Sequence, residues 1–447
     1  MHSIALVSLN SSWSQSNLAL YYMRELIRDL PCKVQMLAYS INEPLLQILH
    51  GITASEADVI CFSAYIWNRE SISGLCQALK KILPQVTIVI GGPEAARVEG
   101  PADLIRVLGS GERAFRQLAV CGFSRLEPAR EIPLSEVPFP YHPEDRDTLQ
   151  DHLVYYETIR GCPYHCDYCL SANDECQDSR FDPHKPEDQR RLQAELEAII
   201  ALQPRTVKFI DRSFNFCKTQ AHWIWDYLIK AECACDFHFE IYPDLLTQAD
   251  IDLLARAPEG RIRLEVGVQT TNDGINRNCG RQSSWQKTKA ALIELKQRTR
   301  VRIHADLLAG LPGESFTSVT KSLDELCACH PDAIQLGFLK ILPDTPMAEK
   351  ASLLGYQWLD DPPYQVLATD RMSFSELGRL DEYAHLLGLY WNKQEFSTWW
   401  AELLQKNSAT AVLEQLRLLH QADAISLHSV SKADRHRMMQ TLMDHLY

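Results

Sequence analysis

Residues 157–170 read ETIRGCPYHCDYCL and place three cysteines on one short stretch, Cys162, Cys166 and Cys169, spaced C-x3-C-x2-C. Three thiolates at this spacing are able to hold three irons of a [4Fe–4S] cluster and leave the fourth iron without a protein ligand. A metal site with an open position binds and activates a substrate, whereas a closed site is structural. We therefore interpret these cysteines as ligands of an open iron–sulfur site.

Two other interpretations of the three cysteines stay open. A structural zinc ion takes four ligands, usually from paired C-x2-C knuckles, and His165 stands too close to Cys166 to complete such a set well. A chance group of buried cysteines is the third interpretation, since a lone cysteine in an apolar stretch is usually a small core residue. The C-x-C pairs at 233–235 and 327–329 are expected to be structural.

The composition is that of an ordinary globular protein. The chain has 447 residues, of which 46% are hydrophobic and 23% charged, and its net charge is −13. No apolar run reaches the roughly 18–20 residues that span a bilayer, and the first residues lack the pattern of a secretory signal. The negative charge disfavours a bulk electrostatic grip on nucleic acid or on an anionic membrane. We expect a cytoplasmic protein with reduced thiols, no nucleic-acid partner and no membrane partner.

Residues 1–120 alternate between apolar strand patterns and amphipathic helix patterns. Strands are expected at 3–9, 33–39, 58–65, 86–92 and 104–112, with helices between them. Near-continuous apolar strands separated by helices indicate a parallel, doubly wound α/β sheet, and a flavodoxin-like (Rossmann-like) strand order is the expected topology. Residues 121–151, rich in proline and charge, are interpreted as a linker.

The strand–helix alternation returns at residue 152. Strands are expected at 153–159, 206–211, 236–242, 262–269, 301–310 and 333–342. Six βα repeats over 152–345 are too short for an eight-unit barrel of about 250 residues, so the sequence predicts a partial (βα)6 TIM-type barrel. In such folds the site lies at the C-terminal ends of the strands. Residues 346–447 are helical in pattern and rich in aromatics, which indicates a helical C-terminal domain.

The cysteine stretch, with Tyr168 before the last cysteine at the end of the first barrel strand, resembles the radical S-adenosylmethionine (radical SAM) superfamily. LEVGVQTTNDGINRNCGRQ (264–282) and HADLLAGLPGES (304–315) resemble the fourth and fifth strands of the branch that includes oxygen-independent coproporphyrinogen dehydrogenase. The resemblance implies that SAM binds the open iron and that one electron cleaves SAM to a 5′-deoxyadenosyl radical. That radical then abstracts hydrogen from an unreactive carbon.

The resemblance also implies SAM contacts at the strand ends. Glu240 matches the acid that pairs with the SAM ammonium, and Arg281 matches the arginine that meets the SAM carboxylate. Gln269 and Asp306 match contacts to the ribose. Each also has an ordinary structural explanation, as a polar residue at a strand end or a solvated surface charge.

Three more residues are candidates with a less direct match. Tyr156, six residues before Cys162, either stacks near the cluster or belongs to the barrel core. Many superfamily members carry Gly-Gly-Glu after the second strand, where this chain reads FIDRSFNF (209–216). Asp211 and Asn215 are therefore candidate SAM or substrate contacts, and the usual assignment is in doubt here.

A flavodoxin-like sheet ahead of a radical SAM barrel resembles the cobalamin-binding class of the superfamily. SAYIWN (63–68), IVIGGPEA (88–95) and GSGERAF (109–115) look like the strand-end loops that line cobalamin. The implied cobalamin contacts are Ser63, Gly91, Gly92 and Glu94. Glycine at such positions is also plain turn chemistry. GSGERAF is not G-x-G-x-x-G, so NAD is the weaker interpretation.

One feature of cobalamin binding is missing from residues 1–120. Cobalamin mutases and methionine synthase coordinate cobalt from below through Asp-x-His-x-x-Gly, and that motif does not occur there. The radical SAM class often lacks the histidine too, so binding would then rest on shape and on backbone contacts. A vestigial cobalamin domain stays open as an alternative.

The whole layout most resembles a family of cobalamin-domain radical SAM proteins with a characteristic C-terminal domain. The leading hypothesis is a cobalamin-dependent methyltransferase that acts on an unactivated carbon of a small molecule or peptide, with flavodoxin or ferredoxin as the electron donor. The second hypothesis is a radical SAM enzyme that catalyses a rearrangement, cyclisation or oxidation without methyl transfer. The third is a redox-responsive metal-binding protein that is not an enzyme.

Overall fold

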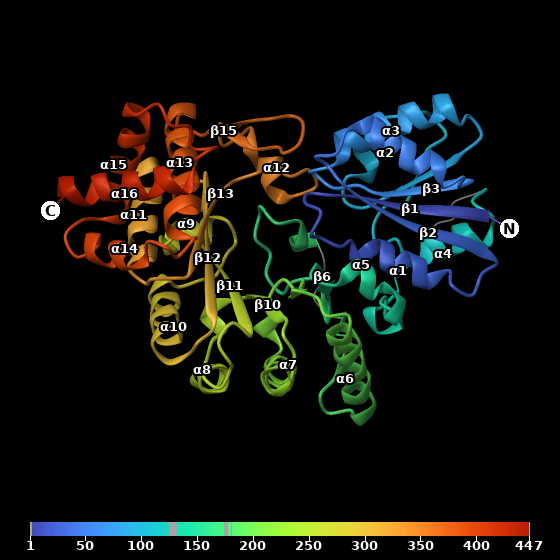
Figure 1. Ribbon diagram of the computed structural model, residues 1–447, viewed down its shortest axis with the longest axis horizontal. Coiled ribbons are helices and arrows are strands. Elements are labelled where there is room, and N and C mark those ends of the chain that lie inside the picture. The colour runs from blue at the N-terminus through green and yellow to red at the C-terminus, as the bar shows by residue number, and fades with distance from the viewer. Residues whose placement is uncertain (1, 125–131, 174–177, 180, 447) are drawn as a thin grey trace. The chain divides into compact units, whose positions relative to one another are not determined.

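The computed structural model of the chain (Figure 1) describes residues 2–124, 132–173, 178–179 and 181–446. These residues fall into two units, each assembled from several segments of the chain. Unit 1 comprises Met1–Arg160, Gln177–Ile210 and Glu232–Cys235, and unit 2 comprises Gly161–Cys176, Asp211–Ala231 and Asp236–Tyr447. Among the described residues, no helix is both long enough and apolar enough to cross a membrane.

The N-terminal part of unit 1 is a five-stranded parallel sheet in the order β2-β1-β3-β4-β5. Its strands are β1 (His2–Asn10), β2 (Cys32–Ser40), β3 (Val59–Ser63), β4 (Thr87–Gly91) and β5 (Ile105–Arg106). This is the predicted flavodoxin-like order, and the prediction is confirmed. β5 is much shorter than the predicted strand at 104–112, because a turn with Gly109 at a φ of 73° follows it closely.

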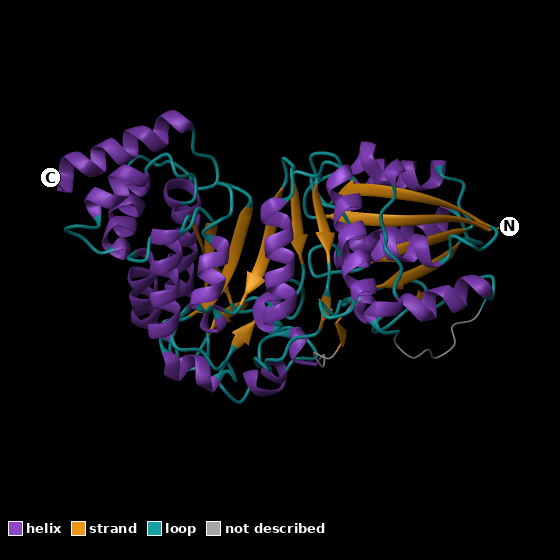
Figure 2. Cartoon of the chain, turned by 90° about the horizontal axis from the view of Figure 1, so that it is seen from below, coloured by secondary structure: helices purple, strands orange, loops and turns teal. Residues whose placement is uncertain are grey.

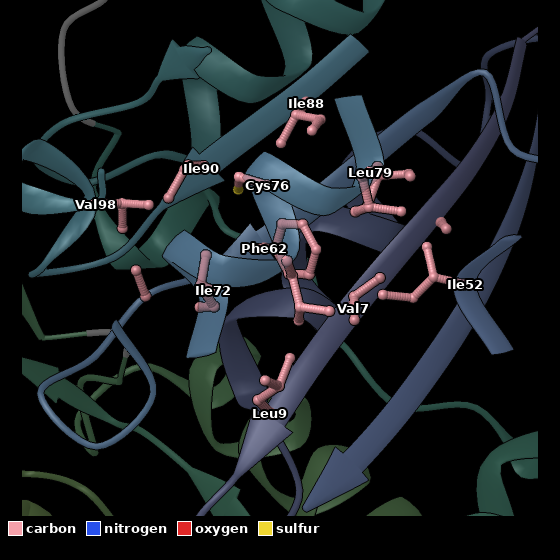
Figure 3. Packing of buried hydrophobic residues seen from close by; sticks show 14 of the residues in the cluster. Val7, Leu9, Ile52, Phe62, Ile72, Cys76, Leu79, Ile88, Ile90 and Val98 are labelled. Atoms are coloured by element: carbon pink, nitrogen blue, oxygen red, sulfur yellow. The ribbon is translucent and has the colours of Figure 1, made fainter. Parts of the chain in front are cut away.

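Helices cover both faces of this sheet, as a doubly wound fold requires. On one face, α2 (Leu45–Ala54) and α3 (Arg69–Ile82) pack against strand side chains; Figure 3 shows this cluster, including Val7, Phe62, Ile72 and Leu79. On the other face, α1 (Leu18–Leu26) and α4 (Glu112–Val120) cover a second apolar cluster. Every residue of β3 is buried, which explains its unbroken apolar sequence.

All six strands predicted for the partial barrel are present, and the α/β fold class is confirmed. In unit 1, β6 (Leu153–Tyr156) pairs in parallel with β9 (Thr206–Phe209). In unit 2, four strands pair in parallel in chain order: β10 (Asp236–Ile241), β11 (Ile262–Gln269), β12 (Arg302–Ala309) and β13 (Ala333–Phe338). Figure 2 shows these strands flanked by helices.

In the described ranges, two short strands and eight helices connect or flank the six barrel strands. They are α5 (Arg146–Leu149), β7 (Ile159–Arg160), β8 (Asp178–Ser179), α6 (Pro186–Ala201), α7 (Lys218–Lys230), α8 (Gln248–Leu254), α9 (Asp273–Asn278), α10 (Trp285–Arg298), α11 (Phe316–Cys327) and α12 (Pro346–Ala351). The expected linker holds α5 and short 3-10 turns, and its residues 125–131 lie outside the described residues.

The strands of unit 2 have one apolar face and one polar face. Along β11, buried and half-buried residues alternate strictly, and the buried set is Ile262, Leu264, Val266 and Val268. The alternate positions carry Arg263, Glu265, Gly267 and Gln269. Neighbouring residues in a parallel register share a face. The polar side chains of all four strands therefore gather on one side of the sheet.

The C-terminal region is mostly helical, with one correction to the prediction. An antiparallel hairpin of β14 (Gln357–Trp358) and β15 (Val366–Ala368) interrupts it. The loop between these strands contains Pro362 and Pro363, and proline does not support a helix interior. The helices that follow are α13 (Phe374–Leu386), which runs into a π turn, α14 (Ser397–Leu403), α15 (Ala409–Ala422) and α16 (Lys432–Leu446).

Trp391 and Trp400 belong to the core of this helical region. Both side chains are buried, their rings lie 5.0 Å apart, and their indole N–H groups donate to the carbonyls of Pro331 and Tyr390. A buried indole with a satisfied N–H is a stable core residue. This is the helical-core role that aromatic residues in such a segment most often have.

Gly92 offers a test of the turn that closes β4. Its φ is 95°, and a Cβ at this position would lie 2.5 Å from the backbone oxygen of Ala64. We expect Gly92→Ala to lower the free energy of unfolding of unit 1 by about 1–3 kcal/mol, because backbone cannot move aside cheaply. Gly91→Ala is the matched control, since its Cβ would meet no heavy atom within 4 Å. Urea titration of both variants checks this, and equal losses would contradict the steric explanation.

Candidate active site

The three cysteines of the motif lie on the loop that follows β7. Cys162 and Cys166 are buried and Cys169 is half-buried. The backbone N–H of Cys169 donates to the carbonyl of Cys166 at 3.0 Å, and the Cys162 sulfur lies 3.6 Å from the Ser213 hydroxyl. Burial raises the pKa of the Cys166 thiol, and the Arg281 guanidinium opposes this shift.

The donor chemistry of this loop fits the iron–sulfur interpretation. Three thiols within eight residues are the soft ligands that such clusters take, and no imidazole or carboxylate is needed. Within the ranges that the structure describes, no three His, Cys, Asp or Glu side chains are grouped so as to hold a metal ion. The residue types fit the cluster, and Cys162, Cys166 and Cys169 are the residues that would hold it.

A turn at residues 279–281 packs directly against this cysteine loop. The N–H of Asp167 donates to the carbonyl of Cys279 at 2.9 Å, and Lys350 pairs with the Asp167 carboxylate at 2.8 Å. Gly280 has a φ of 73°, and a Cβ there would lie 2.7 Å from the carbonyl oxygen of His165. Only glycine fits this approach. The turn therefore sets the position of the next residue, Arg281.

Arg281 completes a stack of three side chains beside the loop. The rings of Tyr164 and Tyr242 are parallel, with centroids 4.0 Å apart, and the Arg281 guanidinium lies 4.5 Å from the Tyr242 ring centre. Arg281 is buried, and it also donates to the carbonyl of Gly267. Within the described part of the chain, its Nε atom is buried without a hydrogen-bond partner. A buried guanidinium with an unused donor suits a carboxylate.

Gln269 and Gly267 adjoin Arg281 at a bulge in β11. The register shifts between these two residues, and Gln269 has a φ of 67°. A Cβ on Gly267 would lie 2.7 Å from the Gln269 amide nitrogen and 3.5 Å from an Arg281 nitrogen. The bulge therefore brings Gln269 and Arg281 together over Gly267. Asp306 is the register partner of Gly267 on β12, so three of the four strand-end SAM contacts that the resemblance implies lie on or beside this bulge.

Glu240, the fourth predicted SAM residue, lies near the end of β10. Its carboxylate is 3.9 Å from the guanidinium of Arg212, a residue that the sequence interpretation did not use. Asn215 is buried and holds the backbone of Tyr242 from both sides: its amide donates to the Tyr242 carbonyl and its oxygen accepts from the Tyr242 N–H, each at 2.9 Å. Asn215 therefore fixes Tyr242, which differs from the expected SAM contact.

Two other predicted residues lie in cores. Tyr156 is fully buried in unit 1, its hydroxyl donates to Glu195, and its ring packs edge-on against Phe209. This agrees with the barrel-core alternative for Tyr156. Asp211 is 1% exposed, directly after the β9 segment.

The polar face of β10–β12 carries two imidazole–carboxylate pairs. His238 Nε2 lies 2.9 Å from the Glu265 carboxylate, and His304 Nε2 lies 3.4 Å from that of Asp306. Glu265 and His304 are register partners, so the two pairs adjoin. The inner layers of a TIM barrel are normally filled by branched apolar side chains. This face is instead built for polar contacts.

The sequence interpretation missed Arg212, Tyr164 and Tyr242. Tyr242 follows Glu240 by two residues, and the period of a strand places both on one face. Tyr164 stands inside the cysteine loop that was already singled out. Their stacking was not predictable, because it joins segments about 80 residues apart.

The predicted cobalamin residues of unit 1 lie at the carboxyl ends of β3 and β4. Ser63 and Gly91 are register partners, and the space beside Gly91 is open. Glu94 is buried and 3.5 Å from the Arg69 guanidinium. Glycines at adjacent strand ends permit the close approach of a bulky ligand to the backbone.

Aromatic side chains adjoin this glycine edge. The rings of Tyr65 and Trp67 stack with centroids 4.4 Å apart, and Trp67 is 45% exposed. The buried Asn68 amide holds the loop by donating to the carbonyls of Leu9 and Ser63, each at 3.0 Å. An open glycine edge beside stacked rings fits a flat macrocycle such as a corrin.

Comparisons with known proteins match three parts of the chain to family models. Residues 6–119 match the family model of the B12 binding domain, and residues 156–326 match that of the Radical SAM superfamily. Residues 354–443 match a third family model, which is described as a protein of unknown function (DUF4080). The resemblances to these two domain types are thereby confirmed.

Two curated relatives and one solved structure illustrate the likeness. An oxygen-independent coproporphyrinogen III oxidase of Paracoccus denitrificans is 32% identical over 28% of this chain and 27% of its own length. The cobalamin-dependent radical SAM methyltransferase TokK of Streptomyces tokunonensis is 25% identical over 69% of this chain. The match covers 51% of TokK, so the chain spans about half the length of that relative.

The solved structure is that of the radical SAM methyltransferase TsrM of Kitasatospora setae, with tryptophan and a SAM analogue bound. It superposes with a TM-score of 0.63 at 16% identity, covering 80% of this chain and 79% of TsrM. At this identity the likeness concerns the fold.

Glu314 is a buried acid in the loop between β12 and α11. It is 1% exposed, and its carboxylate accepts from the backbone N–H groups of Gly310 and Leu311 at 3.2 and 3.4 Å. Burial raises the pKa of Glu314 to about 8, although these hydrogen bonds oppose the shift. The protonated carboxyl is thus the main form in the folded protein at neutral pH.

The raised pKa of Glu314 makes stability depend on pH. Between the unfolded pKa of about 4.3 and the folded value of about 8, the unfolded state releases the proton and the folded state keeps it. The free energy of unfolding therefore falls with rising pH, by up to about 1.4 kcal/mol per pH unit. We expect Glu314→Gln to flatten this slope in chemical denaturation at pH 5 to 8. The exposed Glu349→Gln is the control, and an unchanged slope in Glu314→Gln would refute the assignment.

Proposed function

We propose that this chain, whose residues 6–119 and 156–326 match the B12 binding domain and the Radical SAM superfamily, transfers a methyl group to an unactivated carbon of a small molecule. The observation that carries the proposal is the loop with three thiols, packed against the buried Arg281, whose Nε has no hydrogen-bond partner among the described residues. The likeness to a cobalamin-dependent radical SAM methyltransferase over 69% of the chain supports this reaction.

The residues around the loop have separable tasks in this proposal. When bound, the cluster supplies the electron that cleaves SAM, and cobalamin supplies the methyl carrier. Cys162, Cys166 and Cys169 hold the cluster. Arg281 orients the SAM carboxylate through its free Nε–H, and the Tyr242 ring keeps the guanidinium in place. The burial of this stack excludes water from the reacting atoms.

Three other side chains complete the proposed SAM site. Gln269 and Asp306 bind the ribose hydroxyls from adjacent strands. The bulge at Gly267 shifts the register between these strands and so determines which residues lie side by side. Glu240 accepts a hydrogen bond from the SAM ammonium, and its carboxylate also forms an ion pair with the Arg212 guanidinium, 3.9 Å away.

The polar face of β10–β12 is the proposed location of the substrate. The pairs His238–Glu265 and His304–Asp306 offer both donors and acceptors on adjoining strands. A substrate with hydroxyl, amine or amide groups would be held there by hydrogen bonds, which an apolar barrel interior does not provide. A flavodoxin or ferredoxin of the cytoplasm is the proposed reductant.

The cluster assignment is tested by replacing each ligand. Cys162→Ala, Cys166→Ala and Cys169→Ala are each expected to reduce iron and sulfide after anaerobic reconstitution well below the wild-type value of about four irons per chain. Cys121→Ala is the control, because Cys121 is exposed and outside the loop. Metal analysis with the absorbance spectrum checks this. Zinc in place of iron in the wild type would refute the radical mechanism.

Methyl transfer is tested by the products of SAM. The enzyme is reconstituted with iron, sulfide and hydroxocobalamin and incubated anaerobically with SAM and a strong reductant. We expect S-adenosylhomocysteine together with 5′-deoxyadenosine, since the corrin, once reduced by the added reductant, accepts the methyl group of SAM and leaves S-adenosylhomocysteine. 5′-Deoxyadenosine alone, with corrin bound, would favour a rearrangement, cyclisation or oxidation and would overturn the methyltransferase proposal.

A further inference from the structure

Arg160 stands directly before the cysteine loop and is held by two carboxylates. Its guanidinium donates to Glu112 at 2.6 Å and to Glu157 at 2.8 Å. The side chains are only 24%, 7% and 9% exposed, so solvent screens these charges little. Gly161, the first residue of unit 2, follows Arg160 along the chain. The ion-pair cluster Glu112–Arg160–Glu157 therefore fixes the point from which the cysteine loop departs.

Glu112 belongs to the other motif that the sequence singled out. It is the first residue of α4 and lies within GSGERAF (109–115), one of the strand-end segments of the B12 binding domain. The Arg160–Glu112 ion pair thus ties the GSGERAF turn of unit 1 to the last residue before the cysteine loop. Neither the spacing nor the composition of the two motifs predicts this contact, because 48 residues separate them.

The second carboxylate oxygen of Glu112 lacks a hydrogen-bond donor among the described residues, which indicates that a ligand supplies one. Glu112 is 6% exposed, and in the part of the chain that the structure describes its Oε2 is buried without a hydrogen-bond partner. A buried carboxylate oxygen is costly without a donor. The side chains at the edge of a corrin ring end in carboxamides, whose N–H groups are donors of the required kind.

We propose that Glu112 accepts a hydrogen bond from a corrin carboxamide and that Arg160 is a positioning residue, which links corrin binding to the cysteine loop. A ligand N–H on Glu112 Oε2 further stabilises the arrangement in which Glu112 holds Arg160, the residue from which the loop departs. By linkage the cluster-loaded loop favours the same arrangement, so each cofactor raises the affinity for the other. This inference rests on the proposed function, because it requires both cofactors.

The chain offers a matched control for the charges involved. Arg24 and Asp145 form an ion pair in unit 1 with 19% and 8% exposed side chains, and the two residues are bound through both guanidinium nitrogens. This pair is as buried as Arg160–Glu112, but it connects to neither motif. Arg24→Gln therefore reports what the loss of a comparable ion pair does to unit 1 alone.

The experiment compares the affinity for hydroxocobalamin of cluster-loaded and cluster-free protein by absorbance titration. In the wild type we expect at least about fivefold tighter binding with the cluster present, the lower end of ordinary allosteric coupling. Glu112→Gln and Arg160→Gln are expected to reduce that ratio to about one, and Arg160→Lys to restore part of it. Arg24→Gln is expected to keep the wild-type ratio. Circular dichroism and thermal melting show that each variant is folded.

The other outcomes separate this inference from the proposed function. If the wild type binds no corrin in either form, the proposed function fails and the coupling with it. If it binds equally well with and without the cluster, the coupling is wrong and the proposed function stands. If Arg24→Gln abolishes the ratio as fully as Arg160→Gln, the pair is merely structural and the inference is overturned. If Arg160→Gln does not fold, the ratio in Glu112→Gln decides.

Discussion

The contact between the 279–281 turn and the cysteine loop is the constraint on which the site of unit 2 depends. Gly280 brings its backbone against the carbonyl of His165 where no side chain fits, and Cys279 accepts from the N–H of Asp167. This contact joins residues more than 100 positions apart in the sequence. Because Arg281 is the next residue, the same contact that fixes the loop also fixes the guanidinium beside it.

The polar face of the sheet follows from strand parity. Every second residue of β10, β11 and β12 points to one side, and the parallel register lines those residues up across the strands. The opposite side is apolar and buried, which stabilises the sheet without any help from the polar side. The polar face is therefore not needed for this burial, and its histidines and carboxylates offer hydrogen-bond donors and acceptors.

The sequence was sufficient for the architecture and for the composition of the site, but not for its contacts. The parallel strands of the N-terminal sheet were predictable because buried strands such as β3 are unbroken apolar runs. Two details of the predicted architecture were wrong. β5 stops early at a glycine turn, and a hairpin whose loop contains a proline pair interrupts the C-terminal helical region. Tyr156 was ambiguous, because a tyrosine near a cofactor and a tyrosine in a core look alike until its hydroxyl is found bonded to Glu195.

Long-range contacts account for what the sequence did not predict. Arg212 beside Glu240, Tyr164 on Tyr242, and Arg160 on Glu112 each join residues from separate segments. Local propensity has no information on such pairs, since it concerns neighbours within a few residues. A resemblance transfers residue roles one by one and is equally silent on which side chains touch.

The burial of Arg281 shows why these contacts matter for binding. A guanidinium taken out of water costs free energy unless anions and hydrogen bonds compensate it. In the protein its contacts are the face of Tyr242, the carbonyl of Gly267 and the thiol of Cys166, which compensate a full positive charge only partly. Thiolates that hold a cluster and the carboxylate of SAM are both anionic, so each would complete that compensation. Ligands that supply negative charge beside this cation would therefore stabilise the folded protein as they bind.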